Sequence, residues 1–204
     1  MPQPIPLHGI KDGITRAGTG FLVDDGRRMW LVTCAHLITG LKATSPEASR
    51  FHSGRLNVVG RPFGVDLYVQ NAQRYAAVVN QRDGLLADVI AVRLTPIEMA
   101  GLIAYGSYDI GSIVAPEIGE LVQATGFPGM GVTPIAPTLL KARIDGIAGL
   151  SIQLSVPGAR GFSGSALEGE AGLLGILHGD LGADPNFTNG LAISLDLVGP
   201  QLFI

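Results

Sequence analysis

The hexapeptide at residues 161–166, Gly-Phe-Ser-Gly-Ser-Ala, has the residue types that can expose a serine hydroxyl for chemistry. Glycines stand close to Ser163 on both sides, and an apolar segment typical of a strand, Leu173–Leu177, follows. Glycine lets the backbone turn sharply, so the hydroxyl can project while nearby N–H groups converge on one point. A serine nucleophile needs such donors because it generates an oxyanion. Taken alone, the hexapeptide fits a simple turn between two strands equally well.

A neutral serine also needs an adjacent base, and the base needs a partner that orients it. The chain has four histidines: His8, His36, His52 and His178. His36 comes directly after a strongly apolar strand segment, so we expect it at a strand end near the core. The alternative for His36 is a buried histidine that hydrogen-bonds to a carbonyl. His8, in a proline-rich lead, and His52, in a polar loop, are expected to be solvated.

Asp88 is the strongest candidate for the orienting acid. It opens the apolar run Val89–Val92, and an acid at the start of an apolar strand is unusual. Asp66 and Asp83 are rivals, but each lies in a glycine-containing turn, where a structural role is common. Cys34, two residues before His36, is expected to be core packing. Adjacent residues on a strand point to opposite faces, so we expect its sulfur and the imidazole not to meet.

Composition restricts the class of protein. The 204 residues suffice for one sizeable unit or two small subdomains, and 47% hydrophobic with 15% charged residues allows a large core. A net charge of −3 without a basic run argues against nucleic acid as the main partner. The 29 glycines and 13 prolines favour many short strands over long helices.

The cysteine content and the N-terminal residues indicate the cellular compartment. A single cysteine excludes an intrachain disulfide, which favours a reducing compartment or a bacterial origin. The N-terminal residues lack a basic segment followed by an apolar one, so no signal peptide is expected. No apolar run approaches the roughly 18 residues of a membrane span. We therefore predict a cytoplasmic protein that does not act at a membrane.

Strand segments recur along the chain with turn residues between them, which is typical of an all-β sandwich or barrel. Thr95-Pro96-Ile97-Glu98 is a capping-box pattern, and it predicts a short helix to about Tyr105 that links two halves. Residues 195–202 could form a closing helix. The expected strands are 18–23, 29–33, 55–59, 65–69, 75–79, 89–94, 121–125, 138–143, 151–156, 173–177 and 191–194.

Three segments carry a family resemblance: Thr33–His36, Asp88–Val92 and Gly161–Ser165. In order and spacing they resemble the signature segments of chymotrypsin-like serine proteases, most closely the disulfide-free bacterial HtrA/Deg-type and glutamyl-endopeptidase-like branches. Three other stretches are similar to strands that open the two barrels and close the specificity pocket in that family. They are Gly18–Phe21, Gly119–Pro128 and Gly190–Ile193, so the resemblance extends from about residue 18 to about residue 198.

The resemblance implies two packed six-stranded antiparallel β-barrels with the site between them. The N-terminal barrel would comprise residues 1–97, the connection 98–111 and the C-terminal barrel 112–204. Ser163 would be the nucleophile, His36 the general base and acid, and Asp88 the group that fixes the imidazole. The N–H groups of Gly161 and Ser163 would form the oxyanion hole. The expected activity is that of a serine endopeptidase that needs no metal or cofactor.

Phe162 departs from the family pattern. Secreted digestive members carry there an aspartate that pairs with a newly cut N-terminal amine, so we expect no activation of that kind. Instead, the bulky apolar residue leaves open whether the oxyanion loop is preformed or collapsed.

The resemblance also implies a specificity pocket, with Val156 and Pro157 at its base and Gly190 and Ala192 on its far wall. None of these is acidic, which favours small or medium apolar residues before the cleaved bond (the P1 position).

Glutamate at P1 is the rival specificity, because His178 stands close to a histidine that binds the P1 carboxylate in glutamate-cleaving relatives. His178 lies one residue later than the histidine of those relatives, and a shift of one residue along a strand turns a side chain to the other face of the sheet. The substrate is expected to be a polypeptide bound as an extended strand beside Leu177, His178 and Gly179. The alternative to an enzyme is a catalytically silent peptide-binding or scaffold module on the same fold.

Overall fold

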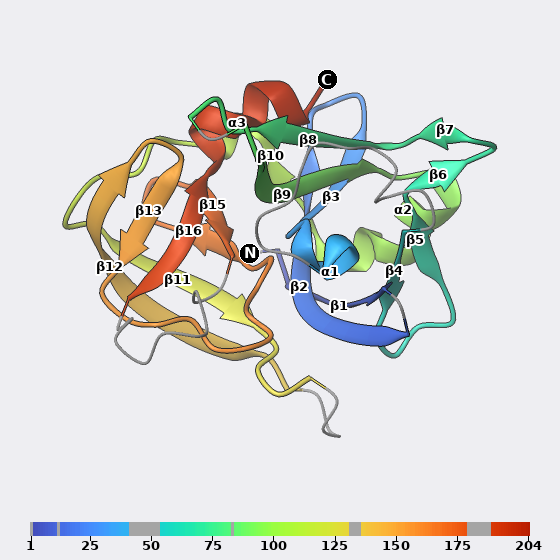
Figure 1. The fold of residues 1–204 in the computed structure, drawn as a ribbon, viewed down its shortest axis with the longest axis horizontal. Helices are drawn as coiled ribbons and strands as arrows, with labels where there is room; N and C mark the ends of the chain where they lie inside the picture. The colour runs from blue at the N-terminus through green and yellow to red at the C-terminus, as the bar shows by residue number, and fades with distance from the viewer. Residues whose placement is uncertain (1, 12, 41–53, 83, 131–135, 179–188) are drawn as a thin grey trace.

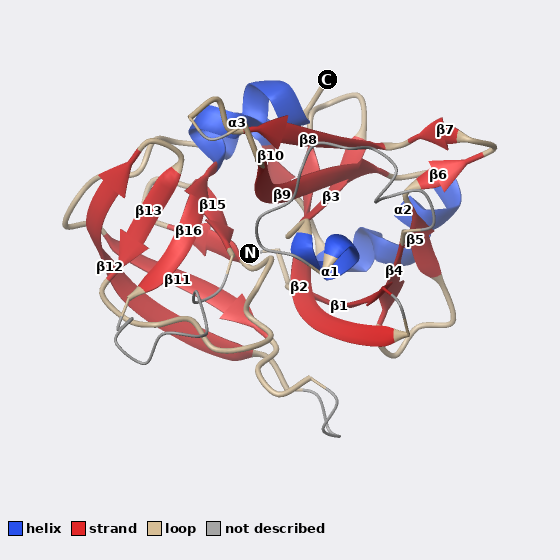
Figure 2. Ribbon diagram, in the orientation of Figure 1, coloured by secondary structure: helices blue, strands red, loops and turns tan. Residues whose placement is uncertain are grey.

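Two β-sheet halves lie side by side in the computed structural model of the chain (Figure 1). The structure describes residues 2–11, 13–40, 54–82, 84–130, 136–178 and 189–204. Strands dominate both halves, and the few helices are short (Figure 2). This arrangement confirms the all-β class and the two-part, chymotrypsin-like architecture predicted from the sequence.

The N-terminal half is a curved antiparallel sheet in the order β5-β4-β1-β2-β3-β9-β8. In the part of the chain that the structure describes, this sheet is a half-barrel, whereas a closed six-stranded barrel was expected. A parallel pairing adds β10 to β2, and β6 and β7 form a separate hairpin. The strands are β1 (Ile5–Lys11), β2 (Ile14–Asp24), β3 (Met29–Thr33), β4 (Arg55–Val58), β5 (Gly64–Asp66), β6 (Tyr68–Val69), β7 (Ala72–Gln73), β8 (Tyr75–Val79), β9 (Leu86–Arg93) and β10 (Tyr108–Asp109).

The C-terminal half is a closed barrel of six strands in the order β11-β12-β13-β16-β15-β14. Side chains of β11 and β13 alternate between buried and less buried, because successive side chains point to opposite faces of a sheet. The apolar half of this alternation fills the barrel. The strands are β11 (Leu121–Gly126), β12 (Thr138–Ala148), β13 (Ser151–Leu154), β14 (Ala166–Glu168), β15 (Leu173–Leu177) and β16 (Gly190–Ser194).

Three α-helices complete the described fold: α1 (His36–Thr39), α2 (Pro96–Leu102) and α3 (Leu195–Leu202). The capping box predicted at Thr95 is present, and a 3-10 turn, Ile103–Tyr105, extends α2 as expected. The closing helix is also confirmed as α3. None of the helices within the described residues is long and apolar enough to span a membrane.

Several expected segments differ from the observed ones. The proline-rich lead forms β1, which pairs with β2 and β4, so His8 belongs to a strand and not to a solvated lead. The expected strand at 65–69 is split between β5 and β6, while β12 extends to Ala148. β9 begins at Leu86, which places Asp88 within the strand instead of at its start. Hydrogen-bond pairing with strands that are distant in the sequence decides these boundaries. The local pattern of apolar and polar residues does not reveal such pairing.

The last helix of the chain completes the core of the first half. Leu195, Val198 and Leu202 of α3 are fully buried and belong to the same apolar cluster as Leu31 and Val92 of the N-terminal sheet. A second cluster fills the C-terminal barrel. Figure 1 shows α3 lying over the top of the molecule beside β8. The two halves therefore meet in the first cluster, to which the C-terminal half contributes α3 together with Leu173, Ile176 and Ile193 of β15 and β16.

Thr19 in β2 joins the two halves at the hexapeptide. Its N–H donates to the Ser163 carbonyl at 2.7 Å, and its hydroxyl donates to the Gly161 carbonyl at 2.8 Å. At Gly164, with φ of +92°, a Cβ would lie 1.8 Å from the Thr19 carbonyl oxygen. Only glycine fits this approach and this backbone conformation. The glycine after Ser163 is thus required by the contact between the halves.

Replacing Thr19 by valine should destabilise the protein by about 1–3 kcal/mol, because the nearly isosteric change leaves the buried Gly161 carbonyl without its donor. Urea unfolding of Thr19→Val and wild type would measure the difference. Thr19→Ser is the matched control, since it keeps the hydroxyl and removes only a methyl group. A serine variant that loses as much stability as the valine variant would contradict this role of the hydroxyl.

Arg74, between β7 and β8, forms the main buried ion pair of the N-terminal half. Its guanidinium donates to both carboxylate oxygens of Glu98 and to the carbonyls of Asp66 and Arg93. Burial raises the pKa of Glu98, but the bonds from Arg74 and Thr95 outweigh this effect, so the pKa of Glu98 lies below its ordinary value. The pair fixes α2 against the sheet.

Arg74→Met should cost about 3–5 kcal/mol near neutral pH, because it leaves a buried carboxylate without its cation. The pairing contributes fully above the ordinary glutamate pKa of 4.5 and is lost as the pH falls through the lowered folded value. The stability gap between Arg74→Met and wild type should therefore narrow as the pH falls below 4.5. Denaturant unfolding across pH tests this, with the exposed Arg93→Met as control. A gap that widens toward acid would refute it.

Candidate active site

His36 and Asp88 meet as a hydrogen-bonded pair. His36 is the first residue of α1, three residues after the end of β3, and Asp88 lies in the neighbouring strand β9. The ring nitrogen Nδ1 of His36 lies 2.6 Å from Asp88 Oδ2, and the backbone N–H of His36 donates to Asp88 Oδ1 at 2.8 Å. The carboxylate thus fixes both the backbone and the ring of His36. Nε2, the other ring nitrogen, is left to accept a proton.

A second histidine faces the same carboxylate. His178 directly follows β15, and its Nδ1 lies 3.6 Å from Asp88 Oδ2, too far for a hydrogen bond. This nitrogen is buried and has no hydrogen-bond partner among the described residues. Burial raises the pKa of Asp88, but the two imidazoles that face it, His178 and His36, outweigh this effect. The pKa of Asp88 is therefore lowered, and the carboxylate is ionised at neutral pH.

Ser163 lies in a tight turn on the C-terminal half. The Ser165 N–H donates to the Phe162 carbonyl at 2.9 Å, and the Gly164 N–H donates to the Leu177 carbonyl at 2.7 Å. Within the described residues, nothing accepts from the N–H groups of Gly161 and Ser163, and no hydrogen bond joins Ser163 Oγ to His36. The turn therefore leaves both predicted oxyanion donors unused.

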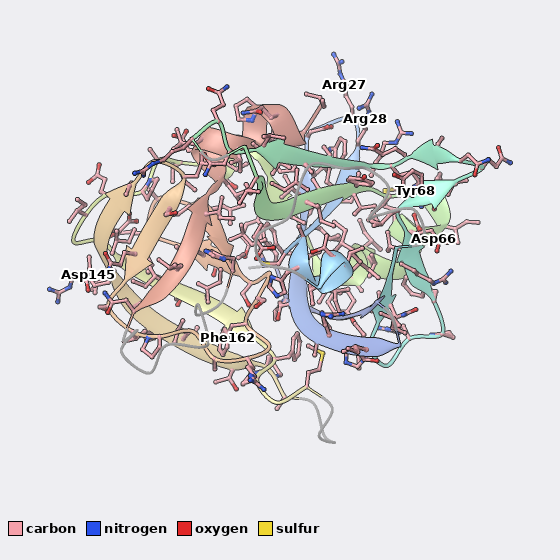
Figure 3. The ribbon with its side chains drawn as sticks, in the orientation of Figure 1. Arg27, Arg28, Asp66, Tyr68, Asp145 and Phe162 are labelled. Atoms are coloured by element: carbon pink, nitrogen blue, oxygen red, sulfur yellow. The ribbon has the colours of Figure 1, made fainter. Side chains whose placement is uncertain are left out.

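Phe162 anchors this turn through apolar packing. Its side chain is 3% exposed and belongs to the cluster that fills the C-terminal barrel, where Figure 3 labels it. A Cβ at Gly126 of β11 would lie 2.7 Å from Cδ1 of its ring. Since the Gly161 carbonyl accepts from Thr19, the peptide after Gly161 is fixed from the other half as well. The turn is held by packing and by Thr19.

The rival acids and histidines do not join this cluster. Asp66 pairs with Arg55 at 3.0 Å, and Figure 3 labels it on the side of the N-terminal half that is remote from the C-terminal barrel. His8 lies within β1. Asp83 and His52 lie outside the described residues. Of the candidates that the structure describes, only His36, Asp88 and His178 stand together.

The residues predicted to line a specificity pocket are partly brought together. The Gly190 N–H donates to the Val156 carbonyl at 2.8 Å, which places these two residues side by side, and Pro157 next to them is exposed. Ala192, in contrast, is fully buried in the cluster of the C-terminal barrel. The ring of His178 faces Asp88.

The backbone expected to bind substrate is also only partly available. The Leu177 N–H donates to Ser165 and its carbonyl accepts from Gly164, so both of its ladder groups are used inside the protein. The His178 N–H donates to Leu191 at 3.1 Å. Gly179 lies outside the described residues. Of the three residues predicted to pair with substrate, Leu177 therefore has no backbone group left for such pairing.

Cys34 differs from its prediction in one respect. It is fully buried, as expected, and its Sγ donates to the Leu177 carbonyl at 3.3 Å. However, Cys34 and His36 are two residues apart, so alternation along a strand would place them on one face and not on opposite faces, and β3 in any case ends at Thr33. Sγ, a ring nitrogen of His36 and a carboxylate oxygen of Asp88 all lie within 4.8 Å of one another. The predicted separation of sulfur and imidazole is wrong.

Sequence reasoning missed two contributions to this site. Thr19 was placed only within a strand-opening motif, although its hydroxyl holds the serine turn. His178 was considered only as a ligand for a substrate carboxylate, whereas it faces Asp88. The motif Gly18–Phe21, which contains Thr19, could have indicated that Thr19 contributes to the site. The position of His178 directly after the apolar segment Leu173–Leu177 could have indicated that His178 does.

Solved structures show the same fold at low identity. A scabies mite inactivated protease paralogue has a TM-score of 0.68 at 13% identity, covering 98% of this chain and 92% of its own. The serine protease domain of the Sesbania mosaic virus polyprotein has a TM-score of 0.57 at 16% identity, with coverage of 98% and 92%. A catalytically inactive tobacco etch virus protease complexed with substrate has a TM-score of 0.57 at 14% identity, with coverage of 95% and 78%.

Among curated protein sequences, no match to this chain is found. The sequence pattern of the trypsin-like peptidase domain, in contrast, matches residues 18–174, which include His36, Asp88 and Ser163. This match covers well over half of the chain. The chain therefore belongs to the trypsin-like peptidase domain family.

Proposed function

We propose that the protein is a serine endopeptidase in which Ser163 is the nucleophile, His36 the general base and acid, and Asp88 the group that orients the imidazole. The observation that carries this proposal is the hydrogen bond between His36 Nδ1 and Asp88 Oδ2. It directs Nε2 away from the carboxylate and favours the tautomer that can accept a proton. Membership of a peptidase family supports the same reading.

The proposed reaction passes through an acyl-enzyme. Ser163 Oγ attacks the peptide carbonyl carbon as its proton moves to His36 Nε2, and Asp88 stabilises the imidazolium that results. The carbonyl oxygen becomes an oxyanion, which the free N–H groups of Gly161 and Ser163 would bind. The C–N bond then breaks and the amine takes the proton from His36. Water attacks the ester by the same route and releases the acid and Ser163.

The contacts of the serine turn support a loop that is formed without a new N-terminal amine. Phe162 is buried in an apolar cluster, so its position depends on packing and not on an ion pair. The Gly161 N–H belongs to a turn that the bond from the Phe162 N–H to the Ala159 carbonyl closes at 3.1 Å, and the φ of +98° at Gly161 is the positive value that the third residue of a type II turn adopts. The oxyanion donors are therefore proposed to be preformed.

The second candidate function is binding without catalysis. No hydrogen bond joins Ser163 Oγ to His36 within the described residues, and one protein of the same fold is an inactivated protease paralogue. Catalytic hydrogen bonds often tighten only when substrate is bound, so the geometry of the free protein does not exclude the enzyme. Reactivity of the serine separates the two functions.

A fluorophosphonate probe should label the wild-type chain at Ser163, because only a serine activated by a base attacks the phosphorus. Ser163→Ala should lose the label, and Asp88→Asn should lower the rate of peptide hydrolysis by about 10⁴. Ser165→Ala is the matched control, since Ser165 lies in the same turn but is fully buried. Mass spectrometry of the labelled peptide gives the position.

Absence of labelling in a folded wild-type chain would favour the binding module. Label that persists in Ser163→Ala but disappears in Ser165→Ala would show that the nucleophile is the other serine. Either result overturns the assignment of Ser163.

The proposed P1 preference is for small or medium apolar residues. Val156 and Gly190 supply apolar and backbone surface, Pro157 lacks an N–H donor, and the ring of His178 faces Asp88 rather than these residues. A charged P1 side chain would therefore lose its hydration without gaining a partner. A neighbour of this fold has been solved with substrate, which supports a polypeptide ligand.

Chromogenic peptides that end in Ala, Leu, Glu or Lys should be cleaved with the largest kcat/KM after Ala or Leu, by a factor of roughly 10 or more over Glu and Lys. Comparing the four peptides on the wild-type chain tests the pocket. A preference for Glu that disappears in His178→Gln would contradict the assignment and show that His178 binds substrate.

A further inference from the structure

Strand β8 lies at one edge of the N-terminal sheet, and the protein surface along it is hollowed. In the described part of the chain β8 pairs with β9 alone, so no strand lies along its other side. One hollow is lined by residues 73–77 and a second by residues 78–82, so together they follow the whole strand. Gln201 of α3 lines both, and Figure 1 shows α3 beside β8. We call the two joined hollows the β8 groove.

The two edges of this sheet differ in their protection against pairing with another chain. The opposite edge, β5, has three residues and carries an exposed ion pair between Asp66 and Arg55. β8 has five residues, Tyr-Ala-Ala-Val-Val, and none is charged. Its pairing with β9 is regular over Tyr75–Ala77 and shifts register only before Val79. Such an edge offers backbone N–H and C=O groups to an added strand.

Apolar side chains of both halves line the groove. Val79 of β8 and Leu197 of α3 are 40% and 47% exposed there. Leu150, in the turn between β12 and β13, lines the same end. Every second side chain of an extended segment points to the same face, so apolar residues at alternate positions of a bound segment would cover this surface.

The charges of the groove favour an acidic partner. No described aspartate or glutamate lines it, although the whole chain has a net charge of −3. Exposed arginines stand at its two ends, Arg82 and Arg93, and neither forms an ion pair within the described residues. Arg74 is neutralised by its buried ion pair, and the backbone oxygen of Ile204 accepts from Arg28. Two guanidiniums are therefore left for carboxylates of a partner.

We propose that the β8 groove binds an acidic polypeptide segment, which adds to β8 as a further strand of the N-terminal sheet. Residues 75–79 extend over about 17 Å at roughly 3.4 Å per residue, so a segment of about five residues would cover the strand. Carboxylates on either side of that segment would reach Arg82 and Arg93. No described residue that lines the groove belongs to the candidate active site, so this proposal does not depend on Ser163 being a nucleophile.

Fluorescence anisotropy of a labelled peptide tests the groove. The probe is fluorescein-labelled Glu-Glu-Val-Ala-Val-Ala-Val-Glu-Glu, and the protein is the full chain with Ser163→Ala, so that the peptide is not hydrolysed. Binding should saturate and weaken as salt is added. The same peptide with lysine in place of glutamate should have a Kd at least about tenfold higher. N-methylation of alternate central residues should raise the Kd at least about tenfold, because an added strand needs those N–H groups.

Matched variants locate the binding site on the protein. Arg82→Glu should raise the Kd at least about fivefold, whereas Arg61→Glu, at an exposed arginine between β4 and β5, should leave it within about twofold of the original value. Leu197→Ala should raise the Kd by a factor of about three or more. Leu139→Ala, at a leucine that is 48% exposed on the C-terminal barrel, should leave it unchanged.

The contrary results are equally definite. Absence of saturable binding, equal binding of the lysine peptide, or a Kd that Arg82→Glu and Leu197→Ala leave unchanged overturns the proposal. Equal binding of the N-methylated peptide overturns the addition of a strand. A chain that is dimeric without peptide and becomes monomeric in Leu197→Ala would show that a second copy occupies the groove instead. These measurements involve no hydrolysis, so failure of the proposed function would leave them unaffected.

Discussion

The two hydrogen bonds that Thr19 donates to the serine turn are the constraint on which the site depends. His36 and Asp88 belong to the N-terminal sheet, while Ser163 belongs to the C-terminal barrel, so no local structure fixes the distance between them. Thr19 holds the carbonyls of Gly161 and Ser163 from the opposite half, and Gly164 permits the backbones to approach. A small rotation of one half would displace Ser163 relative to His36, and positional errors of about 1 Å are costly in the catalysis proposed for these residues.

Asp88 is the electrostatic centre of this arrangement. A buried carboxylate is unfavourable unless it is paired, and here two imidazoles and a backbone N–H face it. Only one of the imidazoles is within hydrogen-bonding distance. The second, His178, leaves a buried nitrogen without a partner, and a protein retains such a group at some cost in stability. Unsatisfied groups of this kind are more common at functional sites than in ordinary cores.

The sequence predicts most of what is locally determined. The three segments around His36, Asp88 and Ser163 are recognisable because their signals, which are strand ends, apolar runs and glycines, are each contained in a few consecutive residues. What the sequence does not predict depends on distant pairing. β1 was missed because its prolines suggest a loop, although β2 and β4 on either side make it a strand. The proximity of Cys34 to His36, within 4.8 Å, was missed because the two residues were treated as adjacent, whereas residues two apart share one face of a strand.

The position of α3 has a consequence for how the chain is made. Leu195, Val198 and Leu202 complete the core of the N-terminal sheet, yet they are synthesised after every strand of that sheet. A chain synthesised from its N-terminus cannot bury that core until residues 195–202 have emerged. The first half must therefore wait, with apolar surface exposed, until α3 has been synthesised. Folding of the first half is coupled to synthesis of the second, and a chain that stops before residue 195 lacks part of the core of the first half.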